Sequence, residues 1–304
     1  MTNVLVLGSE GMLGHMLLAV LRQVPGWRVE GTQFRDLAAP WYFDAQDDIE
    51  ALSALDPKRE TFHWFINAIG LTRANIREND PVSVVRAIAL NTTFPQALAE
   101  YARSLNARVM HISTDGVFST GQGSLTESRP ADAVDVYGQS KLLGEVKNNP
   151  RVLNLRCSLV GPSPLERGGL LEWFLQQADG AQIKGYTNCL WKGVSTLQFA
   201  DLCRNVIENN LFDALRRESP VLHWAPNQAV SKYALLNLFK EVFSKPVTVM
   251  PVEAPQATDR VLASQYEGLG RLFPRETPLR DVLRDLKNFM ASGPYQTLFK
   301  GRWQ

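Results

Sequence analysis

The first half of this 304-residue chain alternates short apolar runs with stretches of helical periodicity. Strands that alternate with helices favour right-handed crossovers and a parallel sheet covered on both faces. The runs are nearly continuous in apolar residues, which is typical of strands buried on both sides. We therefore predict an α/β fold with a doubly wound parallel (Rossmann) sheet. Its expected strands are 4–7, 27–32, 41–43, 64–69, 108–113 and 152–155, and its expected helices are 13–24, 47–55, 81–105 and 137–147.

Glycine and proline crowd the segment 161–169, and the pattern changes after it. We expect residues 1–160 to form a dinucleotide-binding domain and residues 161–304 to form mainly a smaller, C-terminal substrate-binding domain. A segment near 197–224 is expected to return to the first sheet. The predicted helices of this half are 170–177, 197–209, 231–243 and 279–290, and the short predicted strands are 221–224 and 247–252.

A glycine-rich turn joins the first predicted strand to the first predicted helix. Glycine adopts positive φ without steric cost, and the missing Cβ lets the backbone approach a pyrophosphate. The helix N-terminus adds unpaired N–H donors. A turn that only reverses the chain is the alternative. We predict a dinucleotide site whose contacts include Gly8, Gly11, Met12, Leu13 and Gly14.

The residues after the second predicted strand bear on which dinucleotide binds. Glu30 lies inside the run, too early to reach the ribose, whereas Arg35 follows it and could pair with a 2′-phosphate. This favours NADPH, with NADH possible, although Arg35 could also be a solvated loop arginine. Asp44, at the end of the third predicted strand, could contact the adenine or cap the next helix.

Tyr137 and Lys141 are four residues apart on a predicted helix and so share one of its faces. Reduction of a ketone needs a proton for the new alkoxide, and a nearby ammonium lowers the pKa of a tyrosine. The same lysine can hydrogen-bond the nicotinamide ribose. The alternative is an amphipathic helix with a surface tyrosine and lysine.

The strand at 108–113 runs into Thr114 and Asp115. The ends of parallel strands line the ligand crevice of such sheets, where a hydroxyl could hydrogen-bond the substrate oxygen. The alternative is a turn in which these side chains satisfy their own backbone.

These motifs, together with Asn67-Ala68 and Asn91, resemble the extended short-chain dehydrogenase/reductase superfamily. Within it, the chain is similar to the dTDP-4-dehydrorhamnose reductases and their relatives, which reduce the 4-keto group of nucleotide-linked sugars. The strings STDGVF at 113–118 and YGQSKLLGE at 137–145 are the most specific. Segments 156–161 and 230–233 are also similar.

The resemblance implies a catalytic set of Thr114, Tyr137 and Lys141. It implies that Asn91 holds a water in the proton relay. It also implies that Asn67 and Ala68 lie along the cofactor, and that Ser158 lies near the nicotinamide.

Two segments depart from the family pattern. Rhamnose reductases usually carry Tyr where Gly116 stands, and they differ from this chain at 71–75. Related 4,6-dehydratases need an additional acid and base after the threonine, which Gly116 cannot complete. Dehydration is therefore disfavoured, whereas a 4-epimerase using the same Tyr and Lys stays open.

The segment 185–193, a predicted loop, combines aromatic and polar side chains that could bind the substrate. Aromatic rings could stack on a base, and Asn or Lys could bind its edge or the diphosphate. Packing on the domain and exposure to solvent are the alternatives. The predicted substrate contacts are Asp115, Tyr186, Asn188, Trp191, Lys192 and Arg260, with Arg167 a further candidate for the phosphates.

Composition limits the partners. The net charge of +1 gives no support for a nucleic-acid or anionic-membrane partner. No apolar stretch approaches the ~18 residues that span a bilayer, and we expect no signal peptide. Three cysteines without a C-x-x-C pair, Cys157, Cys189 and Cys203, indicate a reduced, cytoplasmic location. The histidines show no ligand spacing, and we expect no metal site.

We therefore predict an NAD(P)H-dependent oxidoreductase that reduces the 4-keto group of a nucleotide-activated deoxy sugar, as part of cell-surface polysaccharide synthesis. A homodimer is a possible assembly. One alternative is an NAD-dependent nucleotide-sugar 4-epimerase. Another is a non-catalytic dinucleotide-binding regulatory subunit, because the same superfamily includes a non-catalytic partner of methionine adenosyltransferase.

Overall fold

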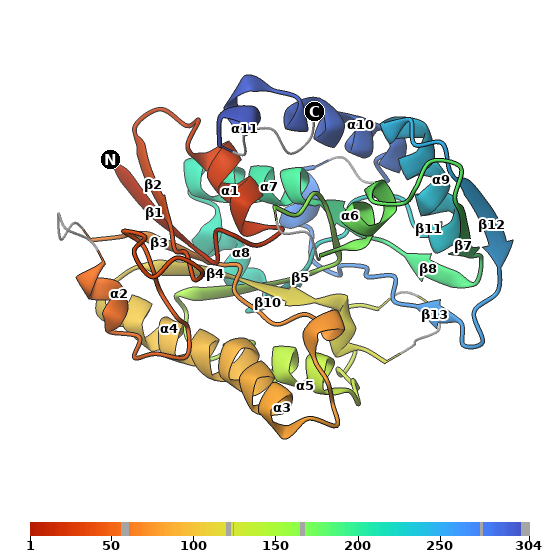
Figure 1. Cartoon of the computed structure of the whole chain (residues 1–304). Coiled ribbons are helices and arrows are strands. Elements are labelled where there is room, and N and C mark those ends of the chain that lie inside the picture. The colour runs from red at the N-terminus through yellow and green to blue at the C-terminus, as the bar shows by residue number, and fades with distance from the viewer. Residues whose placement is uncertain (56–60, 120–122, 124, 165–167, 274–275, 299–304) are drawn as a thin grey trace.

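A computed structural model describes residues 1–55, 61–119, 123, 125–164, 168–273 and 276–298. Its centre is a six-stranded sheet of order β10-β5-β4-β3-β1-β2 (Figure 1), in which every pair is parallel. These strands are β1 (Thr2–Leu7), β2 (Trp27–Gly31), β3 (Trp64–Asn67), β4 (Arg108–Thr114), β5 (Val152–Cys157) and β10 (Val221–His223). The chain reverses its strand order between β1 and β3, the kind of position where such sheets bind ligands. The predicted doubly wound α/β fold is confirmed.

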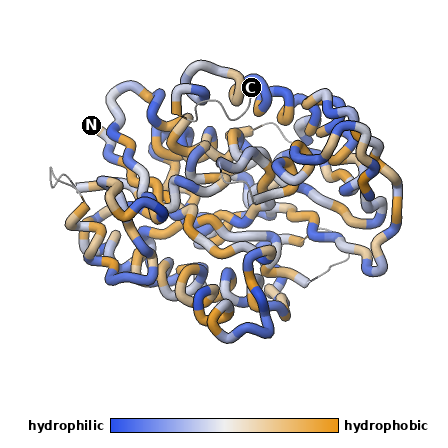
Figure 2. The backbone as a smooth tube through the Cα atoms, in the orientation of Figure 1, coloured by the Kyte–Doolittle hydropathy of each residue, from blue (hydrophilic) through white to orange (hydrophobic). Residues whose placement is uncertain are grey.

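Alternate side chains of the central strands enter two separate apolar cores. Val4 and Val6 of β1 pack into one core, whereas Leu5 and Leu7 pack into the other. This follows from the two-residue period of a strand. Both faces are covered, so most positions are apolar, and hydrophobic segments run through the central sheet in Figure 2.

Helices cover both faces of this sheet (Figure 1). One face carries α1 (Gly14–Leu21), α7 (Thr196–Glu208), α8 (Phe212–Glu218), α10 (Leu279–Met290) and α11 (Gly293–Leu298). The other carries α2 (Ala51–Ala54), α3 (Pro81–Ile88), α4 (Phe94–Ser104) and α5 (Val136–Leu143). In α10 the buried residues recur every three or four positions, which gives the helix one apolar face.

The predicted helix 81–105 is interrupted by a π-helical turn, η2 (Ala89–Thr93). Pro95 has no N–H to donate to the carbonyl of Asn91, four residues earlier, so the regular ladder cannot continue there. Gly144, which ends α5, packs against this carbonyl; a Cβ at 144 would overlap the Asn91 oxygen. The wide turn thereby places Asn91 in the interior, between α3 and α5.

Some element predictions were wrong. Residues 41–43 form no strand: Gln33 exchanges backbone hydrogen bonds with Trp41 and Phe43, which makes a single bridge to Tyr42. This run is apolar because Phe43 fills the core against Phe94, a packing contact that needs no strand. The predicted helix 47–55 is reduced to α2, and the predicted helix 137–147 ends at Leu143.

The C-terminal part adds small sheets beside the carboxyl ends of the central strands (Figure 1). In one sheet β7 (Gln182–Tyr186) pairs with β12 (Thr248–Val252), and in another β8 (Cys189–Trp191) lies between β11 (Val230–Ser231) and β13 (Thr258–Asp259). The prediction of a loop at 185–193 was therefore wrong, because β7 ends within it and β8 lies inside it. The remaining elements are α6 (Leu170–Leu175), α9 (Lys232–Phe243) and the pair β6 (Leu159–Val160) and β9 (Val194–Ser195).

The domain division stays a proposal: a dinucleotide-binding part at 1–160 and a mainly substrate-binding part at 161–304. In support, α7, α8 and β10 pack on the central sheet, with β10 beside β5. Among the residues that the structure describes, no helix is both long and apolar enough to cross a membrane.

Candidate active site

A groove opens at the carboxyl ends of β1, β3, β4 and β5. Its larger cavity, about 640 Å³, is lined by the glycine-rich turn, the segment after β3, the end of β4 and α5. A smaller cavity, about 210 Å³, lies beside the loop that follows β2. Both cavities are lined by Gly11 and by residues 68–70, so they form two parts of one elongated groove.

The glycine-rich turn brings bare backbone to the middle of this groove. Gly8 has a φ of +81°, and its carbonyl accepts the N–H of Gly11 at 3.1 Å. A Cβ at Gly14 would overlap the Gly8 carbonyl oxygen, so Gly14 allows α1 to pack closely behind the turn. Met12 and Leu13 line the larger cavity. The turn thus has the open backbone that a pyrophosphate requires.

Arg35 and Asp44 both line the smaller cavity. Glu10, within the glycine-rich turn, accepts the backbone N–H groups of Phe34 at 2.7 Å and Arg35 at 3.2 Å, which ties the two loops together. Arg86 of α3 also lines this cavity and was missed in the sequence. Nothing in its helical surroundings distinguishes it from a solvated arginine.

Asn67 and Ala68 continue β3 toward the groove, but they have different surroundings. Ala68 lines both cavities. Asn67 is fully buried; its amide contacts Nδ1 of His111 at 3.1 Å, and its carbonyl accepts the N–H of Ile69 at 3.0 Å. Asn67 therefore does not line either cavity and instead holds the backbone of the loop after β3.

Tyr137 and Lys141 lie on the groove side of α5 and line the larger cavity together. Asp135 caps this helix by accepting the N–H of Gly138 at 2.8 Å. Burial raises the pKa of Tyr137 to about 12, and burial lowers the pKa of Lys141 to about 8. The Lys141 ammonium donates to the Ile112 carbonyl at 2.6 Å.

The pKa of Tyr137 is not governed by Lys141 in the way the spacing alone suggests. After burial, the next largest influence is hydrogen bonding with the Thr114 side chain, which lowers the pKa. The carboxylate of Asp115 then raises it, and the guanidinium of Arg73 lowers it. Arg73 belongs to η1 (Arg73–Asn75), within the segment 71–75 that we expected to depart from the family pattern.

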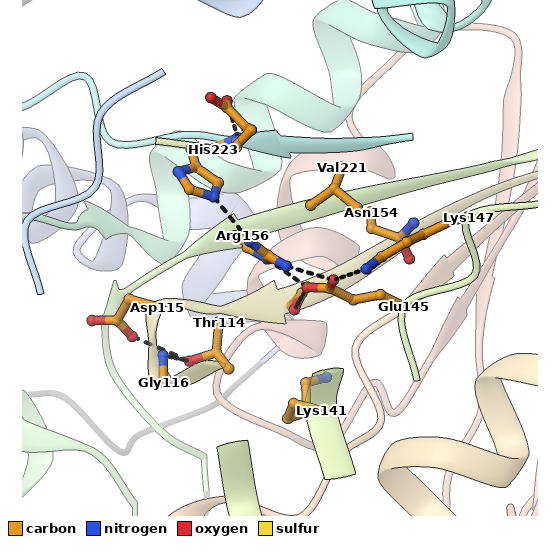
Figure 3. A network of polar contacts seen from close by, with 12 residues as sticks. Thr114, Asp115, Gly116, Lys141, Glu145, Lys147, Asn154, Arg156, Val221 and His223 are labelled. Carbon is orange, nitrogen blue, oxygen red and sulfur yellow. Dashed lines mark hydrogen bonds and ion pairs between the residues drawn. The ribbon is translucent and has the colours of Figure 1, made fainter. Parts of the chain in front are cut away.

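Thr114 and Asp115 lie where β4 passes into the turn η3 (Asp115–Val117), as Figure 3 shows. The Thr114 hydroxyl accepts the N–H of Gly116 at 3.0 Å and donates to Asp115 at 3.1 Å. A Cβ on Gly116 would lie 2.9 Å from Cε1 of Tyr137. The space that a side chain would fill at position 116 is therefore taken by the Tyr137 ring.

Asn91 does not line the groove but joins three segments around it. Its carbonyl accepts the N–H of Leu71 at 2.8 Å, and its amide donates to the Leu71 carbonyl and to Oγ of Ser140, both at 3.0 Å. It thus fixes the segment after β3 against α5.

Positive side chains of the C-terminal part face Asp115. Burial raises the pKa of Asp115, and the charges of Arg260, Lys232 and Arg73 lower it. Lys232, the first residue of α9, lies 5.8 Å from the ring centroid of Trp191. Lys232 was missed in the sequence, although the segment 230–233 had been noted for its resemblance. Arg260, a predicted substrate contact, also lines the larger cavity.

Three predicted substrate residues do not line the groove. The side chain of Asn188 bonds the backbone of Ala254, the ammonium of Lys192 pairs with Glu276 at 3.1 Å, and Tyr186 lies at the end of β7. Asn188 and Lys192 flank β8 and have partners outside the groove, and Tyr186 is exposed. Trp191 does line the cavity, and its indole N–H donates to Oγ of Ser158 at 2.9 Å. Arg167 lies outside the described residues.

A buried ionic network supports α5 from behind (Figure 3). Glu145, which has no exposed side-chain surface, accepts from Arg156 at 2.6 and 2.8 Å and from the Ser113 hydroxyl at 2.7 Å. Arg156 also contacts Nε2 of His223 at 3.2 Å. Burial lowers the pKa of His223, so the neutral ring accepts from Arg156 and donates through Nδ1 to backbone carbonyls. Across the described parts of the chain, no cluster of three or more His, Cys, Asp or Glu residues could hold a metal ion.

Comparison with known proteins is consistent with this architecture. The subunit beta of methionine adenosyltransferase 2 from Mus musculus is 24% identical over 301 residues, covering 93% of this chain and 86% of the relative. A dTDP-4-keto-6-deoxy-D-glucose reductase from Streptomyces niveus is 31% identical over 142 residues, covering 46% of this chain and 45% of the relative. The crystal structure of a dTDP-4-dehydrorhamnose reductase from Bacillus anthracis in complex with NADP has a TM-score of 0.75 at 15% identity, covering 95% and 99% of the two chains.

A family model settles which family these similarities reflect. The model of the RmlD substrate binding domain matches residues 1–269, which is most of the chain. The match spans the glycine-rich turn, the Thr114 strand end and the Tyr137 helix described above. It confirms the resemblance to the extended short-chain dehydrogenase/reductases. The chain belongs to the RmlD substrate binding domain family.

Proposed function

We propose that this chain is an NADPH-dependent reductase of the 4-keto group of a nucleotide-activated deoxy sugar. The observation that carries the proposal is the meeting of Thr114, Tyr137 and Lys141 in one cavity with the open glycine-rich turn. The reductase from Streptomyces niveus and the rhamnose reductase from Bacillus anthracis, which binds NADP, support the reaction and the cofactor.

The shape of the groove fits an extended dinucleotide. Arg35 and Asp44 would hold the adenosine end in the smaller cavity, and the bare turn at Gly8 and Gly11 would hold the pyrophosphate. Ala68 and Ser158 would lie along the nicotinamide end in the larger cavity. When bound, the reduced nicotinamide supplies the hydride for the keto carbon.

Residues of the chain itself then orient the substrate oxygen and donate a proton to it. Tyr137, protonated at neutral pH because its pKa is about 12, donates its phenolic proton to that oxygen. Thr114, which lines the same cavity as Tyr137, orients the carbonyl. Lys141 holds the cofactor ribose, and Asn91 positions α5 by joining it to the segment after β3. Asp115, Lys232 and Arg260 form the charged wall against the sugar and its diphosphate.

The decisive experiment offers the purified protein a panel of 4-keto nucleotide sugars with NADPH and with NADH. We expect loss of reduced-cofactor absorbance and a reduced sugar product with at least one sugar. A parallel panel of 4-hydroxy nucleotide sugars with NAD tests the 4-epimerase alternative, which predicts interconversion of these sugars without net use of cofactor. No turnover in either panel would reject both enzymatic assignments.

Arg35 tests the cofactor assignment. A charged hydrogen bond to a phosphate is worth about 1.5–3 kcal/mol, so Arg35→Gln should raise the KM for NADPH about 10- to 100-fold. The KM for NADH should change little, because NADH has no 2′-phosphate. Arg103→Gln, at an exposed position on α4, is the control. Equal losses with both cofactors would contradict a role for Arg35 at the 2′-phosphate.

Gly116 tests the placement of the proton donor. In Gly116→Ala the new methyl meets Tyr137 and Thr114, and the ring must move. Misplacing a catalytic group by about 1 Å can cost about 100-fold in rate, so kcat should fall by about that factor. In Gly293→Ala the added methyl meets no heavy atom within 4 Å, so its kcat should be unchanged. An unaltered kcat in Gly116→Ala would place the productive ring elsewhere.

A second candidate is a regulatory subunit, favoured by the similarity to subunit beta of methionine adenosyltransferase 2 over 93% of this chain. In that case the groove would bind a dinucleotide without turning it over. Stable association with a larger transferase, combined with no reduction of any sugar in the panel, would support this reading. The complete set of Thr114, Tyr137 and Lys141 favours the reductase.

We further propose a cytoplasmic enzyme of cell-surface polysaccharide synthesis that forms a homodimer. The cysteines support the location, since Cys157, Cys189 and Cys203 are all buried free thiols. Sedimentation of the purified protein measures the assembly directly.

A further inference from the structure

We propose that Arg73 is a positioning residue that holds its guanidinium over the ring of Tyr137 and stabilises the phenolate left by proton donation. This inference rests on the proposed function of Tyr137 as the proton donor. It assigns a role to the segment 71–75, which differs from the pattern of the related reductases.

The placement of Arg73 is built from a pair of contacts. Its Cζ lies 5.6 Å from the centroid of the Tyr137 ring, and its Nη2 lies 2.8 Å from Oδ2 of Asp135. The other oxygen of Asp135 accepts the N–H of Gly138 and so caps α5. One carboxylate therefore fixes both the guanidinium and the start of the helix that carries the tyrosine.

A negative charge beside Tyr137 opposes ionisation of its phenol, and a nearby cation would offset that effect. Asp115, from the turn after β4, raises the pKa of the phenol through the negative charge of its carboxylate. Lys141 is one helical turn away, but its ammonium donates to a backbone carbonyl. Lys232 and Arg260 act on the carboxylate of Asp115. Arg73 lies over the ring, and its charge lowers the pKa of the phenol itself.

The proposed reaction explains why a cation over the Tyr137 ring would help. As hydride from the reduced nicotinamide reaches the keto carbon, the O–H bond of Tyr137 breaks and its proton binds to the substrate oxygen. The electron pair stays on the phenol, so negative charge develops in a largely buried ring. A guanidinium over the face of that ring interacts more strongly with the anion than with the neutral phenol.

The test measures ionisation of Tyr137 without any substrate, so it stays informative if the proposed function fails. The protein is prepared with 3,5-difluorotyrosine, whose lower pKa brings the titration into a range where the fold survives. The 19F signal of residue 137 is assigned by its absence in Tyr137→Phe. The variants are Arg73→Met, Arg73→Lys and Arg77→Met. Arg77 is the control from the same connection between β3 and α3, because it is 79% exposed and pairs with Asp80.

We expect the 19F titration midpoint in Arg73→Met to rise by about one pH unit, the lower end of what a nearby charge produces. Arg73→Lys should recover part of the shift, and Arg77→Met should show none. In Arg73→Met, kcat should fall about five- to tenfold in parallel. An unshifted midpoint in a folded Arg73→Met protein would overturn the proposal. If that protein also lost activity, the loss would indicate that Arg73 binds the substrate instead.

Discussion

Tyr137→Phe is expected to reduce kcat for the keto sugar by about 10³-fold, within the 10²–10⁴ that a general acid contributes. The phenyl ring should keep its place, because the ring packs against Gly116 and only the hydroxyl is removed. The substrate oxygen would then receive its proton from solvent. Binding of the reduced cofactor should be nearly unchanged, because the glycine-rich turn and the loop after β2 are untouched. Steady-state rates and a cofactor titration measure both quantities.

Tyr266→Phe is the matched control, since it removes a phenolic hydroxyl from a part of the chain that does not line the groove. Its kcat should equal that of the unaltered protein. If Tyr137→Phe retained full activity, the assignment of the proton donor would be wrong, and the reductase proposal would lose its main support. If both variants lost activity equally, the loss would reflect damage to the fold.

The central sheet could be predicted because its strands are buried on both faces. Such strands are apolar at most of their consecutive positions, and runs of this kind are easy to find. β8 was missed for the opposite reason. It spans three residues, of which Cys189 and Trp191 are buried and Leu190 is exposed, and a single alternation does not stand out in a sequence.

The candidate site was predictable where its residues are close in the sequence. Tyr137 and Lys141 share a helix face, and Thr114 ends a strand, so local structure alone brings them to the groove. Arg86 lines the smaller cavity and Lys232 the larger one, but both belong to distant segments of the chain. Only the packing of whole elements brings them to the groove.

Gly116 and Arg73, one from each segment expected to depart from the family pattern, both contact the side chain of Tyr137. Gly116 leaves room for the Tyr137 ring, and Arg73 covers that ring. In the sequence these positions are more than forty residues apart, and nothing local connects them. Both positions therefore shape the surroundings of the proposed proton donor. The substrate this chain accepts should therefore differ in shape from that of relatives with a tyrosine at position 116.

The other large effect concerns stability. Arg156→Met is expected to lower the free energy of unfolding by about 3–5 kcal/mol, because it leaves the buried Glu145 carboxylate without its main partner. Lys147 lies 3.7 Å from the same carboxylate, but its side chain is half exposed and compensates little. The neutral ring of His223 would also lose its donor. Urea unfolding followed by circular dichroism measures the difference.

Removing both charges should cost less than the sum of the single changes. In Glu145→Gln with Arg156→Met no uncompensated ion stays buried, so we expect a coupling free energy of about 1–3 kcal/mol between the two positions. Arg103→Met breaks an exposed pair with Glu100 and should cost less than about 1 kcal/mol. The interpretation fails if Arg156→Met is no more costly than Arg103→Met, or if the two changes are strictly additive. Additivity would mean that Glu145 and Arg156 stabilise α5 and β5 independently, and that the network behind the catalytic helix does not act as a unit.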